Sequence, residues 1–94
     1  MASQVREKVF ASLQISTEQF LEEMAFLLSK QQLSEYAMEV AYFEKKHGRT
    51  FAEFDRDLQT QAATHDLEND WLSWKFAVES RGYWLNYLNI KLLL

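Results

Sequence analysis

The chain contains no proline and only two glycines, Gly48 and Gly82, among its 94 residues. Average usage would place about 5 prolines and 6 to 7 glycines in a chain of this length. Turns and phosphate-binding loops depend on these residues, so the shortage argues against a turn-rich sandwich, a barrel or a glycine loop. The absence of cysteine also excludes a disulfide framework and a thiolate metal site. We therefore expect a mainly α-helical fold.

The length of the chain suits one compact domain, which we expect to span residues 1–94. The sequence contains no run of 18 apolar residues, which is about the length needed to cross a membrane. The N-terminus carries Arg6, Glu7 and Lys8 where a signal peptide has its apolar core. Ten basic against fourteen acidic residues give a net charge of −4, so no basic field attracts nucleic acid or an anionic membrane. These features predict a cytoplasmic protein that does not bind membranes.

The first predicted helix begins after Ser16, because Gln19 completes a capping box and Ile15 with Phe20 has the spacing of a hydrophobic staple. Its apolar residues keep the helical period at Phe20, Met24, Leu27 and Leu28. The next positions in that phase are polar: Gln31, Gln32 and Glu35. The loss of phase predicts a break near Lys30 and a helix over residues 17–29.

A second apolar stripe predicts a second helix over residues 34–47. Its members are Leu33, Tyr36, Val40 and Phe43. Ser34 is available as its N-cap, and Lys45 and Lys46 suit its last turn. Gly48 stands where a left-handed residue commonly ends a helix.

A third helix is predicted over residues 51–62. Thr50 and Glu53 repeat the spacing of a capping box, and an apolar face follows at Phe51, Phe54 and Leu58. This helix is short and acidic on its outer side.

The last predicted helix is long and spans residues 67–92. Its apolar residues follow a heptad-like spacing: Leu67, Trp71, Trp74, Val78, Leu85, Leu88 and Leu92. Arg81 occupies the missing position of this seam. Gly82 beside it costs about 1 kcal/mol relative to alanine within a helix, so a kink or break there and a continuous helix both stay open.

The segment before Ser16 fits two structures. Alternation of apolar and polar residues over 8–15 suits a short β-strand, whereas Val5, Val9 and Leu13 have helical spacing. Because Ser16 caps the next helix, residue 15 is expected to be non-helical, which favours the strand.

No pattern of catalytic or metal-ligating residues emerges from the sequence. The two histidines, His47 and His65, lie 18 residues apart, and no zinc-protease, P-loop, nucleophile-elbow or dinucleotide motif is present. His47 suits the end of a helix and His65 the start of one. We expect no enzyme, no metal site and no cofactor.

The stretch from Glu53 to Asp70 is strongly acidic, with six acidic residues against one basic residue, Arg56. Such a surface steers a basic partner, such as a protein that handles RNA or DNA. A charge run of this kind is also common on an ordinary solvated helix face.

The C-terminal helix carries more apolar and aromatic surface than one stripe can bury in a domain of this size. We therefore predict that it binds another protein, since Trp and Tyr are frequent at interface hot spots. The predicted contact residues are Trp71, Trp74, Val78, Trp84, Leu85, Tyr87, Leu88 and Leu92. An ordinary core helix and self-association are the alternatives for this segment, and we expect the protein to form a homodimer.

A DNA-binding role is a further alternative. A strand followed by two helices over residues 8–47 could pair with a second copy and enter the major groove, with Lys8, Ser12 and Gln14 facing the bases beside Phe10. Residues 1–50 carry six basic and seven acidic side chains, which is a poor balance for contacts with phosphates.

One region resembles small bacterial antitoxins, many of them cyanobacterial, of toxin–antitoxin pairs. The similar pattern is a Tyr-containing helix ending Phe-Glu-Lys-Lys-aromatic-Gly, here Phe43 to Gly48, followed by Phe-x-x-Phe, here Phe51 to Phe54. Those proteins often continue with an acidic stretch and a Trp-bearing helix, here Asp66–Asp70 and then Trp71 and Trp74. His47 stands where Tyr is usual, and the N-terminal stretch separately resembles a ribbon-helix-helix without its basic strand.

The resemblance implies a protein that neutralises a basic, nuclease-type toxin by docking its C-terminal helix and acidic segment over the toxin's active site. The apolar C-terminal helix beside an acidic segment is compatible with that role. We therefore expect a non-enzymatic, antitoxin-like binding module, with a structural homo-oligomer or a DNA-binding repressor as the alternatives.

Overall fold

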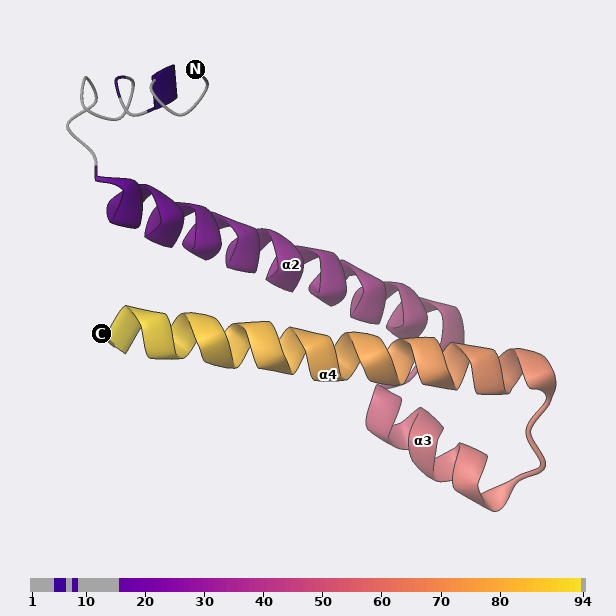
Figure 1. Ribbon diagram of the computed structural model, residues 1–94. Coiled ribbons are helices and arrows are strands. Elements are labelled where there is room, and N and C mark those ends of the chain that lie inside the picture. Colours follow the sequence, from indigo (N-terminus) through magenta and orange to yellow (C-terminus); the bar gives the residue numbers. More distant parts are fainter. Residues whose placement is uncertain (1–4, 7, 9–15, 94) are drawn as a thin grey trace.

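The computed structural model describes residues 5, 6, 8 and 16–93. Within residues 16–93 the chain forms three helices: α2 (Thr17–His47), α3 (Phe51–Thr60) and α4 (His65–Leu93). The two long helices lie side by side and antiparallel, and α3 lies against α4 near the turn between them (Figure 1). No strand occurs among the described residues, so the prediction of a mainly α fold with a long C-terminal helix is confirmed. The possible strand falls largely on residues 9–15, outside the described part, and Lys8 is helical.

Side-chain caps set where each helix begins. The Ser16 hydroxyl accepts from the Gln19 backbone N–H, and the Gln19 side chain accepts from the Ser16 N–H, each at 3.1 Å. Thr50 and Glu53 form the same box at the start of α3. At α4 the Thr64 hydroxyl accepts from the Leu67 N–H at 3.2 Å, so this helix begins two residues before the predicted start. The two predicted capping boxes are confirmed.

Gly48 ends α2 as the sequence predicts. It adopts the left-handed conformation, with φ of 65°, and its N–H donates to the Glu44 carbonyl at 2.8 Å. This geometry reverses the chain after His47 and lets α3 begin three residues later. α3 ends at Thr60, two residues earlier than predicted, because Gln61 is extended with ψ of 154°.

The predicted break near Lys30 is wrong, and so is the cap at Ser34, because α2 is one continuous helix of 31 residues. One set of buried and half-buried side chains of α2 recurs every three and four residues and forms the inner seam: Phe26, Ser29, Leu33, Tyr36, Val40, Phe43 and His47. Ser29 hides this continuity in the sequence. It is only 2% exposed, and its hydroxyl donates to the Ala25 carbonyl at 2.6 Å, so a polar residue sits in an apolar seam at little cost.

α4 is also continuous, so Gly82 does not break it. The residues of α4 that pack toward α2 keep the same three-and-four spacing: Asp70, Trp74, Ala77, Arg81, Trp84, Leu88 and Lys91. The predicted seam through Trp71, Val78 and Leu85 is rotated away from this face. Trp71 and Val78 pack in the core cluster, whereas Leu85, beyond that cluster, stays exposed.

The molecule therefore has two dissimilar halves. At the three-helix end, which comprises residues 43–78, α3 and both long helices enclose an aromatic cluster. The two-helix arm comprises residues 17–32 of α2 and 83–93 of α4. There the long helices continue past α3 as an antiparallel pair, and no third helix among residues 16–93 packs on them (Figure 1). Each long helix is about 45 Å in length, so the arm is a substantial part of the molecule.

A candidate protein-binding surface

The aromatic cluster at the three-helix end is centred on Trp74, which is completely buried. Its ring stacks on Phe43 with centroids 5.7 Å apart, and Phe54 and Phe51 lie at 5.2 and 5.4 Å. The His47 ring also stacks on the indole, with centroids 5.6 Å apart. Side chains of α2 and α3 thus meet on one indole of α4, so this cluster links all three helices.

The buried indole Nε1 of Trp74 has no hydrogen-bond partner among the described residues. An orphaned donor of this kind costs about 1–3 kcal/mol. Packing of the large ring against several others offsets that cost, so Trp74 acts here as a hydrophobic core residue.

A charged group fastens α2 to the start of α4. The Asp70 carboxylate accepts from Lys46 Nζ at 2.7 Å and contacts His47 Nε2 at 2.8 Å. The Lys46 ammonium, and to a lesser degree the His47 ring, hold the pKa of Asp70 below its ordinary value, although burial opposes the shift. The same contact raises the pKa of Lys46. This group lies where His47 was predicted to end a helix.

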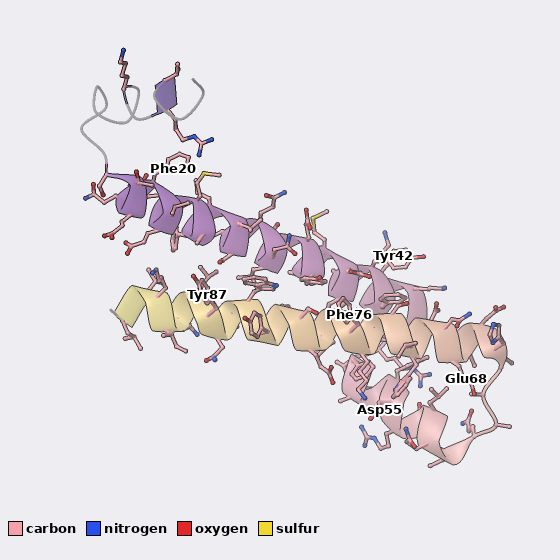
Figure 2. All side chains as sticks on the ribbon, in the orientation of Figure 1. Phe20, Tyr42, Asp55, Glu68, Phe76 and Tyr87 are labelled. Carbon is pink, nitrogen blue, oxygen red and sulfur yellow. The ribbon has the colours of Figure 1, made fainter. Side chains whose placement is uncertain are left out.

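Most of the acidic run from Glu53 to Asp70 is engaged inside the chain. The Trp71 indole N–H donates to Asp55 Oδ1 at 2.7 Å, and Arg49 pairs with Asp57. Asp55 reaches up from α3 toward α4 (Figure 2). In the capping box of α3 the Thr50 hydroxyl and N–H lower the pKa of Glu53. Four of the six acidic residues that suggested a steering surface, Glu53, Asp55, Asp57 and Asp70, therefore have local structural roles.

The predicted contact residues divide between the two halves of the molecule. Trp71, Trp74 and Val78 belong to the three-helix end, where their partners are side chains of the same chain. The others lie on or next to the arm: Trp84, Leu85, Tyr87, Leu88 and Leu92. Leu88 is buried against α2, and Trp84 and Tyr87 are half-buried. Leu85 and Leu92 are open, with 47% and 72% of their surface exposed.

Most of the residues that carry the antitoxin resemblance fall at the three-helix end, and its Tyr-containing helix is the part of α2 that leads into it. Phe43, Phe51 and Phe54 line the aromatic cluster, and Gly48 and Thr50 shape the turn between α2 and α3. These residues determine the turn between α2 and α3 and the aromatic cluster, and none of them lies on the two-helix arm.

The arm exposes a large apolar surface on both helices. Its exposed large hydrophobic residues are Leu21, Met24, Leu27, Leu28, Tyr83, Leu85, Ile90, Leu92 and Leu93. Two helices can cover only the sides on which they meet, and α3 does not reach this far. Contiguous apolar surface beyond a few hundred Å² usually marks a contact with another molecule.

A groove of about 500 Å³ lies on the arm, between the start of α2 and the end of α4. Its lining residues are Gln19, Glu22, Glu23, Phe26, Leu27, Lys91 and Leu92. We call it the distal groove. Apolar side chains from both helices lie within it, and two carboxylates face one ammonium, so it combines apolar contact surface with a net negative charge.

The sequence analysis did not predict that residues of α2 line this surface together with those of α4. Two long helices joined through one short helix must run back along each other, and this brings the first turns of α2 beside the last turns of α4. The length of the two patterns could have indicated this pairing. The false break near Lys30 concealed it, because it divided α2 into two short helices.

The described residues offer little support for a metal site, a membrane-spanning helix or a DNA-binding strand. No three of their His, Asp and Glu side chains come together in a way that could hold a metal ion. None of the helices in residues 16–93 combines the length and apolar character needed to cross a membrane. Of the predicted DNA-contacting residues, Lys8 is exposed, and Ser12 and Gln14 lie outside the described part.

Comparison with known proteins adds no relative. No protein family, no curated protein and no solved structure matches the chain.

Proposed function

We propose that the protein is a non-enzymatic binding module that captures a basic protein partner on its two-helix arm, in the manner of an antitoxin that neutralises a nuclease-type toxin in the cytoplasm. The observation that carries this proposal is the distal groove, in which exposed apolar side chains of both helices lie beside Glu22 and Glu23. The sequence resemblance is compatible with it.

The chemistry of the groove favours a basic amphipathic partner. Leu27 and Leu92 supply apolar contact, which gives most of the affinity in a desolvated interface. Glu22 and Glu23 speed encounter with a positively charged surface and select against acidic ones. Enzymes that cleave RNA carry such positive surfaces because they must neutralise phosphates.

The accessible members of the predicted contact set support the same half of the molecule. Leu85 and Leu92 are the most exposed of them, and Tyr87 and Trp84 lie half-buried nearby. We assign the contact to these residues and to the first turns of α2. Trp71, Trp74 and Val78 act indirectly, because they hold the three-helix end from which the arm extends.

The test is co-expression with the product of the adjacent gene, followed by measurement of the complex mass by light scattering. We expect a hetero-complex that Leu92→Asp weakens at least tenfold, because a charge replaces an apolar contact at the groove. The pair Glu22→Lys and Glu23→Lys should slow association and remove its salt dependence.

Met38→Lys is the matched control, because Met38 is 70% exposed, close to the 72% of Leu92, but lies outside the groove. This variant should bind normally. Absence of a complex, or a complex that is indifferent to Leu92→Asp and to the charge reversals, would contradict the proposal.

A further inference from the structure

α3 is an example, within the chain, of an element that covers the paired long helices. The ring of its Phe54 bridges them, with centroid distances of 4.5 Å to His47 on α2 and 5.2 Å to Trp74 on α4. Its Asp55 accepts a hydrogen bond from the indole N–H of Trp71. A short amphipathic helix of 10 residues is thus held between α2 and α4 by apolar side chains and a polar contact at its edge.

The face of α4 that meets α3 continues along the helix toward its C-terminal end. Trp71 and Val78 pack with the aromatic cluster, and Leu85 and Leu92 follow at further steps of seven residues. Steps of seven return to nearly the same side of a helix, so these four residues share one face, which we call the α3 face. The first two are half-buried, whereas the last two are exposed. The cover therefore ends at Val78, and the α3 face extends beyond it.

The distal groove has the same setting as Phe54, because both long helices bound it. Phe26 and Leu27 line it from α2 and Leu92 from α4. Since Leu92 belongs to the α3 face, the groove opens on the side of the helix pair that carries α3. From Arg81 to Leu92 α4 extends about 16 Å, the length of a helix of about 11 residues. A helix as long as α3 therefore matches the uncovered part of the α3 face.

Charged groups stand at both ends of this uncovered part. Glu22 and Glu23 line the groove at its far end. At the near end Arg81 is half-buried, three residues after Val78 and four before Leu85, and no described residue forms an ion pair or hydrogen bond with it. A carboxylate is the group that a guanidinium binds best. The chemistry thus calls for basic side chains at the groove and a carboxylate at Arg81.

We propose that the basic partner docks on the arm through an amphipathic helix of about three turns, which lies on the α3 face and inserts an apolar side chain into the distal groove. Basic side chains of this helix pair with Glu22 and Glu23, and one carboxylate pairs with Arg81. The inference rests on the proposed function, because it names the element of the partner that the groove receives. The partner helix has on the arm the role that α3 has at the three-helix end.

Photo-cross-linking of the complex with the adjacent gene's product tests for the helix. Benzoylphenylalanine is introduced at Leu85 or at Leu92 of the full chain, and mass spectrometry locates the attachment sites on the partner. The two positions lie about 10 Å apart along α4, which spans about seven residues of a helix but only about three of an extended strand. We expect attachment sites about seven residues apart in one continuous segment. The same reagent at Met38, outside the groove, should give no cross-link.

Arg81→Gln tests the carboxylate. Affinity for the partner should fall at least about fivefold, and Arg81→Lys should recover part of it, because a positive charge is restored. Lys45→Gln is the matched control, because it removes an exposed positive charge outside the arm, and it should bind normally. A merely structural role of Arg81 would instead lower the urea midpoint of the free chain and leave the affinity unchanged.

The results separate this inference from the proposed function. Attachment sites about three residues apart, or in two unconnected segments, would overturn the docked helix. Normal binding by Arg81→Gln would overturn the pairing with Arg81. Either result leaves the proposed function standing if the complex forms and Leu92→Asp weakens it, whereas absence of a complex would contradict both.

Discussion

The three-helix end and the two-helix arm are built from the same two helices, yet they differ in what covers them. At the three-helix end, α3 encloses Trp74, and Trp71 is half-buried with a hydrogen bond to α3. On the arm, Leu85 and Leu92 belong to the same predicted seam but stay exposed. The difference arises from the reach of α3, because the apolar pattern continues along the full length of α4. A partner bound to the arm would cover its exposed apolar residues, as α3 covers those of the three-helix end.

The largest expected effect is at the centre of the three-helix end. Trp74→Ala should destabilise the protein by about 3–5 kcal/mol, because it leaves a cavity among three phenylalanines and His47. That loss is a large part of the total for a domain of this size. Urea unfolding followed by circular dichroism measures it. Leu92→Ala, on the arm, should change the free energy of unfolding by less than about 0.5 kcal/mol.

If Trp74→Ala and Leu92→Ala destabilised the isolated chain equally, the contrast between the two halves would be lost. The arm would then contribute to folding as much as the aromatic cluster does.

Substitution of the two glycines by alanine should change the free energy of unfolding in opposite directions. Gly48→Ala should cost about 1–2 kcal/mol, since alanine is strained at a φ of 65°. Gly82→Ala should stabilise by up to about 1 kcal/mol, because Gly82 lies within α4 and an added Cβ meets nothing within 4 Å. Thermal unfolding of each variant shows whether its stability rises or falls relative to the original protein. A destabilising Gly82→Ala would indicate that α4 is not continuous there.

Local signals predicted much of the fold. The capping boxes at Ser16 and Thr50 and the terminator Gly48 act through residues three or four positions apart, so they can be recognised without knowledge of the tertiary structure. Ser29 could not be recognised in this way, because only burial shows that a serine belongs to the inner seam.

The candidate surface was less accessible to prediction for a related reason. The face of α4 that meets α2 differs by a fraction of a turn from the apolar seam, because α3 packs on part of that seam. Which of its tryptophans are enclosed depends on where α3 lies, and that is set by contacts distant in the sequence. Residues between 19 and 27 line the distal groove together with Lys91 and Leu92. They meet only after the two long helices have packed together, so no local pattern in the sequence predicts this contact.

The smallest of the expected effects concerns pH at the three-helix end. The pKa of Asp70 is lowered in the folded chain, mainly by Lys46, so the unfolded chain binds more protons at that site. Its stabilisation, about 1 kcal/mol, is present above the ordinary aspartate pKa near 4 and is lost as the pH falls through the folded value. Asp70→Asn should therefore lower stability at neutral pH and flatten the acid decline. Urea midpoints between pH 7 and pH 3 measure both, and an unchanged slope in the variant would assign the decline to other carboxyl groups.

Hydrogen exchange of the protein alone and of the complex co-expressed with the adjacent gene's product tests most directly whether the two-helix arm is the binding half. We predict that amides of the three-helix end are already protected in the free protein, because they belong to its core. In the complex, protection should increase over residues 19–27 and 85–92. An increase confined to residues 43–78, or no change over the arm, would contradict the assignment of binding to the half that α3 leaves uncovered.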